Sequence, residues 1–554
     1  MTHLIAEPQI MAAAAAEVEE IGLAISAAND AAAGQISGLA VAAGDEVSAA
    51  IANLFGAYGQ ECQAVMRQAA AFQAEFTRAV AAAGIAYQHV EDAAAVALQG
   101  VLGAPAAPAQ APGAATIPPF PANELSLIMG GTGVPIPSAN LIAKANELYI
   151  RSMSVLPPIG LVTPEELYPI TGVKSLVFDA SVNQGLAILD AAIREQINPP
   201  VSKTVTVFGI SQSAVIASLE MQKLMSEGSP YVGSLNFVLT GNEMNPNGGM
   251  LARFPNLSFS SLGLTFYGAT PPDTPYDTAI YTLEYDGFAD FPRYPLNIIS
   301  DLNAVAGIVY VHPRYFDITP EWLDQNAIEL QPSVPRNTHY YILPADDLPL
   351  LQPLRALPVI GGPLANLIEP NVRVIVNLGY GDPYHGYSTS PPDVWTPFGL
   401  FPDVSPVTVA EALAAGTQQG INNFTFDMSQ LLANPPTLPP LQMPAPTDLT
   451  TDLRVSAADL PSPLTVANTV ASIVSTDYAV LLPTADIALS LVTTLPAYNV
   501  QLFAEQLAQG NLINAIGYPI AANVGLATIA GAVEFLVLAE ALATTIRDIS
   551  SLVP

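Results

Sequence analysis

The chain has 554 residues, of which 51% are hydrophobic and 12% charged, so its composition excludes a disordered polypeptide held apart by charge. Its length exceeds that of one compact core and predicts two or three structural units. The 48 acidic against 16 basic residues give a net charge of -32, which repels phosphate backbones and excludes nucleic acid as a favoured partner.

Residues 1–98 are rich in alanine and predict a helical hairpin, with a break at Gly34–Gly38 and an N-cap at Asp45. The second helix carries an apolar residue every three or four positions from Val47 to Val80, and this stripe needs a partner surface. Cys62 is the only cysteine, which excludes intrachain disulfides and thiolate clusters and favours a buried structural thiol. The first 16 residues lack the basic start of a secretory signal peptide.

An Ala/Pro-rich linker is expected over residues 99–121, followed by an α/β domain over 122–433 in which strand-like runs alternate with helical segments. The predicted strands are Leu125–Met129, Thr204–Gly209, Leu235–Leu239, Ala279–Tyr285 and Val372–Leu378. The predicted helices are Ala139–Ser152, Asn183–Glu195, Ser213–Ser226 and Leu296–Val311. This alternation indicates a mostly parallel central sheet covered by helices on both faces.

Residues 434–554 begin with a proline-rich segment and continue as an apolar helical region without a chemical motif. The longest apolar stretch, Val524–Ala543, contains Glu534 and Glu540 and is interpreted as a buried or interfacial helix rather than a membrane span. A packing role is the simplest interpretation of this region, and a lipid-facing surface is the alternative.

The most informative segment is Thr204–Leu219, in which a β-branched strand enters Gly209-Ile-Ser-Gln-Ser213 and a helix follows at once. This is the context of a nucleophile elbow, where a tight turn exposes a serine above the sheet. Ser211 is therefore the predicted nucleophile. Its structural alternative is a plain strand-to-helix turn.

Two backbone segments are candidates for an oxyanion hole. The N–H of Gln212 lies at the predicted helix start, where free donors point at developing negative charge. The loop Gly130, Gly131 and Thr132 lets the backbone approach a substrate closely, although it is also compatible with a simple glycine turn. No P-loop lysine follows it, which argues against a phosphate cradle.

A serine nucleophile needs a general base, and imidazole has a suitable pKa. His3 and His89 belong to the hairpin and His339 to an extended segment, so His312 and His385 are left as candidates. 

Asp286 and Asp290 both follow the predicted strand Ala279–Tyr285, at the edge of the sheet where active sites gather. We favour Asp290 as the acid, because its distance past the turn gives it reach towards an imidazole.

The chain resembles the mycobacterial PE/PPE proteins: residues 1–98 resemble a PE domain, and residues 120–395 a PE-PPE domain, a serine hydrolase fold similar to cutinases. The strings that carry this resemblance are Ala27–Ala33, Gly44–Ile51, Gln68–Phe72, Met129–Gly133, Gly209–Ser213, Tyr285–Pro292 and Pro295–Gly307. One departure is Pro8-Gln9, where the PE signature has Pro-Glu.

The resemblance implies that Asp290 and His312 complete the triad, because cutinases place the acid in an Ala/Gly-Asp turn and the histidine in a His-x-x-Tyr string. It also implies that Tyr87 and Glu91 form a type VII secretion signal. A PPE protein and a secretion chaperone are then expected to bind the hairpin, and the cell surface or envelope is the expected location, with peripheral association.

The sequence as a whole predicts an exported α/β-hydrolase that acts as an esterase or lipase on acyl esters or lipids. One alternative is an acyltransferase that passes the same acyl group to a sugar or glycolipid hydroxyl, such as that of a trehalose lipid. A second alternative is a non-catalytic surface protein on a hydrolase scaffold. The predicted chemistry calls for neither a metal nor an organic cofactor.

Overall fold

The computed structural model describes residues 124–434 and 462–551, except 153, 155 and 260–262. These residues belong to one compact unit, Pro112–Pro554. The predicted hairpin with Cys62, the Tyr87–Glu91 signal and the linker over 99–121 lie outside the described residues.

A seven-stranded sheet forms the centre of this unit, in the order β2-β1-β3-β4-β7-β9-β8. Its strands are β1 (Leu125–Ile128), β2 (Ile159–Gly160), β3 (Val205–Ile210), β4 (Leu235–Thr240), β7 (Asp277–Leu283), β8 (Ile328–Leu330) and β9 (Thr338–Leu343). Only the β8–β9 pair within this sheet is antiparallel. The predicted mostly parallel sheet is confirmed.

Both faces of the sheet are buried, which explains the continuous apolar runs of its strands. Val205 and Val207 of β3 pack into one core together with α4 (Phe178–Ile197) and α5 (Gln212–Ser226). Phe208 of β3 points to the other face and packs into a second core. Helix α3 (Ala139–Ala145), the π-helix η1 (Asn146–Ile150) and α8 (Pro320–Asn326) cover that face.

The predicted strand Val372–Leu378 is wrong, because these residues form the end of helix α10 (Gly361–Leu378). Its β-branched residues suggested a strand, but Ala365 and Val376 are buried on one face of a helix that also packs against α11 (Pro406–Ala433). Burial of that face therefore outweighed the local β-propensity. The next strand of the sheet is instead β9, which carries His339.

Short elements connect this framework. They are α6 (Met250–Arg253), the hairpin strands β5 (Ser258–Phe259) and β6 (Leu264–Thr265), α7 (Ile298–Tyr310), the 3-10 turns η2 (His312–Arg314) and η3 (Pro349–Leu351), and α9 (Gln352–Arg355). Helix α7 corresponds to the predicted helix Leu296–Val311.

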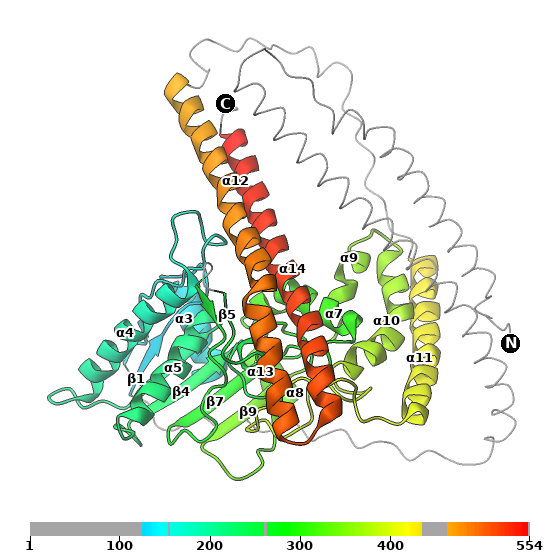
Figure 1. Cartoon of the computed structure of the whole chain (residues 1–554), viewed down its shortest axis with the longest axis horizontal. Coiled ribbons are helices and arrows are strands. Elements are labelled where there is room, and N and C mark those ends of the chain that lie inside the picture. Colours follow the sequence, from blue (N-terminus) through cyan, green and yellow to red (C-terminus); the bar gives the residue numbers. More distant parts are fainter. Residues whose placement is uncertain (1–123, 153, 155, 260–262, 435–461, 552–554) are drawn as a thin grey trace, which may run out of the picture. The chain divides into compact units, whose positions relative to one another are not determined.

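The C-terminal region is helical, as predicted, and consists of α12 (Pro463–Val492), α13 (Thr494–Ala508) and α14 (Leu512–Ser550). Figure 1 shows α14 in red alongside α12 and α13, with its lower part against α7 of the α/β domain. Within the described residues, the segments Leu464–Val492 and Leu512–Ser550 are long and apolar enough to cross a membrane, with mean hydropathies of 1.2 and 1.9. Only 28% of the most apolar window of α14 is buried.

Candidate active site

Ser211 lies at the junction of β3 and α5, in a backbone conformation that few residues adopt. Its φ of 56° and ψ of -127° mark a sharp turn, and its side chain emerges above the carboxyl end of the sheet. Gly209 makes the turn possible, since a Cβ at this position would lie 2.6 Å from the carbonyl oxygen of Ser213. The strand and helix backbones are therefore as close as a nucleophile elbow requires.

Ser213 occupies the position where such elbows usually carry a second glycine. Its hydroxyl accepts a hydrogen bond from the N–H of Ile210 at 2.8 Å and donates to the carbonyl oxygen of the same residue at 3.0 Å. This side chain is fully buried. Through these two hydrogen bonds, Ser213 ties the first turn of α5 to the end of β3. A serine in place of the usual second glycine therefore stabilises the turn.

His312 lies directly after α7, and its Nε2 is 2.9 Å from Ser211 Oγ. Gly241 leaves room for the ring: its φ is +56°, and a Cβ there would lie 2.9 Å from His312 Cε1. Of the two histidines that the sequence left open, His312 is the one beside Ser211. His385 pairs with Asp382 at 3.0 Å, and His339 with Glu329 at 2.8 Å.

The carboxylate that contacts His312 belongs to Asp286, so the expectation of Asp290 at this position is wrong. Asp286 Oδ2 lies 2.8 Å and Oδ1 2.9 Å from His312 Nδ1. Oδ1 also accepts a hydrogen bond from the N–H of Phe288 at 3.0 Å. Asp286 is fully buried, and these donors fix it in one orientation.

A tight turn of the chain places Asp290 away from His312. Its N–H donates to the carbonyl oxygen of Asp286 at 2.6 Å, so the backbone coils back instead of extending towards the imidazole. Its carboxylate is buried near Arg253, and burial raises its pKa well above the ordinary range. Although Asp290 lies further along the chain than Asp286, this turn keeps its carboxyl from extending to the imidazole.

Tyr315 supports the acid and was not predicted to take part in the site. Its hydroxyl donates to Asp286 Oδ2 at 2.7 Å and accepts the N–H of Leu283 at 3.0 Å. The hydroxyl thus ties the carboxylate to the end of β7. The His-x-x-Tyr string contained this signal, since His312 and Tyr315 sit on the same short turn.

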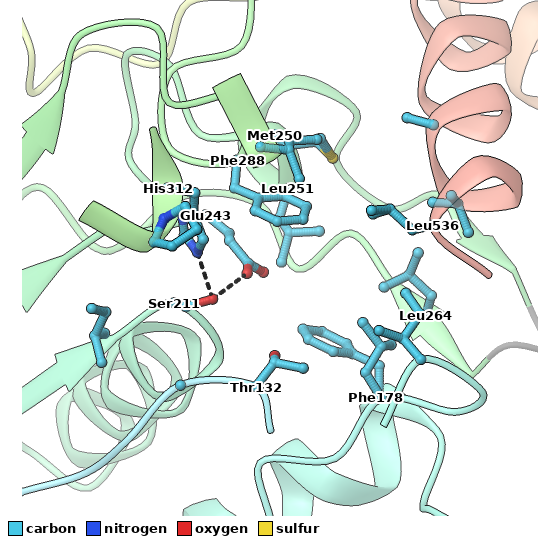
Figure 2. A pocket seen from close by; sticks show the side chains of 18 of the residues that line it. Thr132, Phe178, Ser211, Glu243, Met250, Leu251, Leu264, Phe288, His312 and Leu536 are labelled. Atoms are coloured by element: carbon cyan, nitrogen blue, oxygen red, sulfur yellow. Dashed lines mark hydrogen bonds between the residues drawn. The ribbon is translucent and has the colours of Figure 1, made fainter. Parts of the chain in front are cut away.

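The loop after β1 lies beside Ser211, where the sequence predicted an oxyanion donor. A Cβ on Gly131 would lie 3.2 Å from Ser211 Cβ, and Thr132 lines the cavity next to it (Figure 2). Gly130 instead packs against Val134, where a Cβ would lie 2.1 Å from the carbonyl oxygen. Gln212 is the first residue of α5.

The side chain of Gln212 is held away from the site. Its amide nitrogen donates to the carbonyl oxygen of Glu166 at 2.9 Å, and its amide oxygen accepts from the Ser181 hydroxyl at 2.9 Å. Only the backbone of Gln212 is therefore available at the helix start beside Ser211.

Comparisons with known proteins show the family to which the chain belongs. The PE family matches residues 4–94, and the PE-PPE domain matches residues 157–381. Esterase PE16 of Mycobacterium tuberculosis is 42% identical over 420 residues, which cover 75% of each chain. The chain belongs to the PE family.

Two other relatives from Mycobacterium tuberculosis are similar to parts of the chain. The PPE family protein PPE28 is 50% identical over 454 residues, 78% of this chain and 68% of that protein. SL1278 acyltransferase Chp1 is 29% identical over 221 residues, 39% of this chain and 52% of that protein. This PE protein therefore shares most of its length with one relative named an esterase, and a shorter part with one named an acyltransferase.

Glu243 is a further polar residue of the PE protein's site that the sequence analysis missed. It follows β4, is buried, and its Oε1 accepts a hydrogen bond from Ser211 Oγ at 3.3 Å (Figure 2). Burial raises the pKa of Glu243 to about 7, against the opposing effect of His312. No sequence motif marks this position, because the contact depends on how the loop after β4 folds over the elbow.

The pKa of His312 reflects two opposing causes. Burial lowers it, while the carboxylates of Asp286 and Glu243 raise it, and the net result is a pKa above the ordinary 6.5. Asp286 therefore stabilises an imidazolium at this position, which is what a base that accepts a serine proton needs.

A cavity of about 440 Å³ opens beside Ser211, within the range of small-molecule sites. Its polar lining side chains are those of Thr132, Tyr168, Ser211, Glu243 and His312, and the rest of its lining is apolar. Within the part of the chain that the structure describes, no cluster of three His, Cys, Asp or Glu side chains is placed to hold a metal ion.

The raised pKa of Glu243 predicts a measurable pH effect on stability. A carboxyl with a pKa of about 7 when folded and an ordinary value of 4.5 binds more protons in the folded state between these values. Stability therefore falls as the pH rises through this window, by about 3 kcal/mol in total from this group. Glu243→Gln removes this pH-dependent loss. The stability of the variant relative to wild type should therefore rise by about 3 kcal/mol between pH 4.5 and pH 8.

Urea unfolding of both proteins at the two pH values measures this gain. Glu505→Gln, which removes an exposed carboxylate of α13, is measured in parallel as the matched control. A Glu243→Gln difference that does not change with pH would show that Glu243 is ionised throughout.

Proposed function

We propose that this PE protein is a serine carboxylic ester hydrolase that cleaves acyl esters through an acyl-enzyme. The observation that carries the proposal is the unbroken chain from Ser211 Oγ to His312 Nε2, and from His312 Nδ1 to the Asp286 carboxylate. The relative named Esterase PE16 supports the same reaction class.

The geometry accounts for each step of the reaction. His312 Nε2 accepts the Ser211 proton as Oγ attacks the ester carbonyl, and Asp286 holds the Nδ1–H tautomer and stabilises the imidazolium. The proton then passes to the departing alkoxide, which leaves as the alcohol. Water, activated by the same imidazole, attacks the acyl-serine and releases the carboxylic acid while Oγ recovers its proton.

The negative charge of the tetrahedral intermediate develops beside the start of α5. The backbone N–H of Gln212 and the Gly131–Thr132 segment are the proposed donors to this oxygen. Gly130 contributes by shaping the loop against Val134 rather than by contacting the substrate.

Release of p-nitrophenol from p-nitrophenyl esters tests the proposal. The wild-type chain is expected to release it with saturation kinetics, and Ser211→Ala to give only the buffer rate. Ser218→Ala is the control, because Ser218 lies on the same helix with its hydroxyl bonded to Thr270. Equal rates for wild type and Ser211→Ala would favour the non-catalytic surface protein instead.

Acyl transfer is the second candidate, and the apolar cavity favours it, since a site that admits little water allows another hydroxyl to compete for the acyl-enzyme. The similarity to SL1278 acyltransferase Chp1 points the same way. Adding trehalose or a glycolipid acceptor to the ester assay distinguishes the two reactions: transfer yields an acylated acceptor, and hydrolysis only free acid.

We further propose that the N-terminal PE segment directs export by type VII secretion to the cell envelope and binds a PPE protein and a chaperone. The match to the PE family over residues 4–94 supports this, together with Tyr87 and Glu91 in the sequence. Expression of Tyr87→Ala in a mycobacterial host tests it: the variant should stay in the cell lysate while wild type reaches the envelope fraction.

A further inference from the structure

The C-terminal helix α14 supplies one wall of the cavity beside Ser211. Its lining residues recur at intervals of three and four positions, so they share one face of the helix. They are Ile529, Ala532, Val533, Leu536 and Val537. In Figure 2, Leu536 lies beside the α14 ribbon, across the cavity from Ser211.

Apart from Thr132 and Tyr168, the polar lining side chains of the cavity gather at the elbow. Ser211, Glu243 and His312 meet through hydrogen bonds at the elbow, whereas α14 contributes no polar side chain to the lining. Between them the walls are apolar, with Phe178, Leu264 and Phe288 among the residues that Figure 2 labels. An ester that binds with its carbonyl at Ser211 would therefore extend its hydrocarbon chain between these apolar walls towards α14.

Helix α14 is held in this position by the hydrolase core. Leu526 and Ile529 are buried in the same core as β3 and α5. Gly525 allows close packing, because a Cβ there would lie 3.1 Å from both Phe254 and Pro295. The Thr528 hydroxyl also donates to Asp301 of α7 at 3.4 Å.

We propose that the Ile529–Val537 face of α14 is a binding wall for the acyl chain and makes the enzyme select esters of long-chain over short-chain acids. This inference rests on the proposed ester chemistry at Ser211 and deepens it by naming the substrate class. It also gives the C-terminal region a function, beyond the packing role that its sequence suggested.

Acyl-chain selectivity in the full-length chain tests the wall. We compare kcat/KM for p-nitrophenyl dodecanoate and p-nitrophenyl acetate, both below their aggregation concentrations, in wild type and two variants. Leu536→Asn places an amide in the path of the chain, and Leu536→Trp narrows the cavity. Both should lower kcat/KM for the dodecanoate at least about tenfold more than that for the acetate.

Leu538→Asn and Leu538→Trp are the matched controls, since Leu538 is an exposed leucine of α14 that does not line the cavity. They should keep the wild-type ratio for the two esters. The acetate rate also reports that each variant is folded and active.

The inference is overturned if the Leu536 variants keep the wild-type ratio, or lose both activities equally, because α14 would then serve stability alone. Failure of the proposed function gives a different result, namely equal rates for wild type and Ser211→Ala on both esters.

Discussion

His312→Ala is expected to lower kcat for ester hydrolysis by about 10⁶-fold, the size of loss seen when a serine hydrolase loses its base. His312 Nε2 lies 2.9 Å from Ser211 Oγ, and among the described residues neither His339 nor His385 lines the cavity beside this serine. Stopped assays with p-nitrophenyl esters, at enzyme concentrations high enough to resolve the slow variant, measure the loss.

His385→Ala is the matched control for this prediction. His385 was the rival base in the sequence, but it bonds to Asp382 and does not line the cavity. The rate of this variant should stay within about threefold of wild type. A large loss for His385→Ala with activity retained in His312→Ala would reverse the assignment.

Asp286→Asn is expected to lower kcat by about 10⁴-fold, because an amide next to Nδ1 no longer holds the correct tautomer or stabilises the imidazolium. Oδ1 and Oδ2 of Asp286 together accept from the imidazole, the Phe288 N–H and the Tyr315 hydroxyl. An amide group can accept through one atom only, so at least one of these donors is left without its acceptor. Single-turnover kinetics separate this chemical effect from any change in substrate binding.

Asp290→Asn distinguishes the structure from the sequence-based assignment. The carboxyl of Asp290 is buried near Arg253 and does not line the cavity beside Ser211. The variant should therefore retain kcat within about tenfold and fold with near wild-type circular dichroism. A loss of about 10⁴-fold here, with little loss in Asp286→Asn, would restore Asp290 as the acid.

The sequence was sufficient for features that depend on local pattern. The β-branched run before Gly209 and the apolar run before Ser226 predicted β3 and α5, and the turn between them was predicted as an elbow, with a plain strand-to-helix turn as the alternative. The parallel sheet followed from the alternation of strands and helices. The strand expected at Val372–Leu378 failed, because a helix that buries valines on one face cannot be told from a strand by composition alone.

The rest of the site depends on contacts between segments far apart in the chain. Asp286 and Asp290 follow the same strand, and only the tight turn between them decides which one meets the imidazole. Glu243 lies 32 positions after Ser211 in the chain. The two side chains meet because the loop after β4 folds over the elbow. The α14 wall comes from a region without any motif, so only the packing of Leu526 and Ile529 into the core reveals it.

Trapping the acyl-enzyme tests directly whether Ser211 is the nucleophile. Wild-type protein mixed with excess p-nitrophenyl ester, quenched in acid within one turnover and digested, is analysed by mass spectrometry with fragment-level site assignment. One added acyl group is expected, carried by Ser211 and absent from Ser211→Ala. An acyl group on a different residue, in a protein that still turns over the ester, would contradict it.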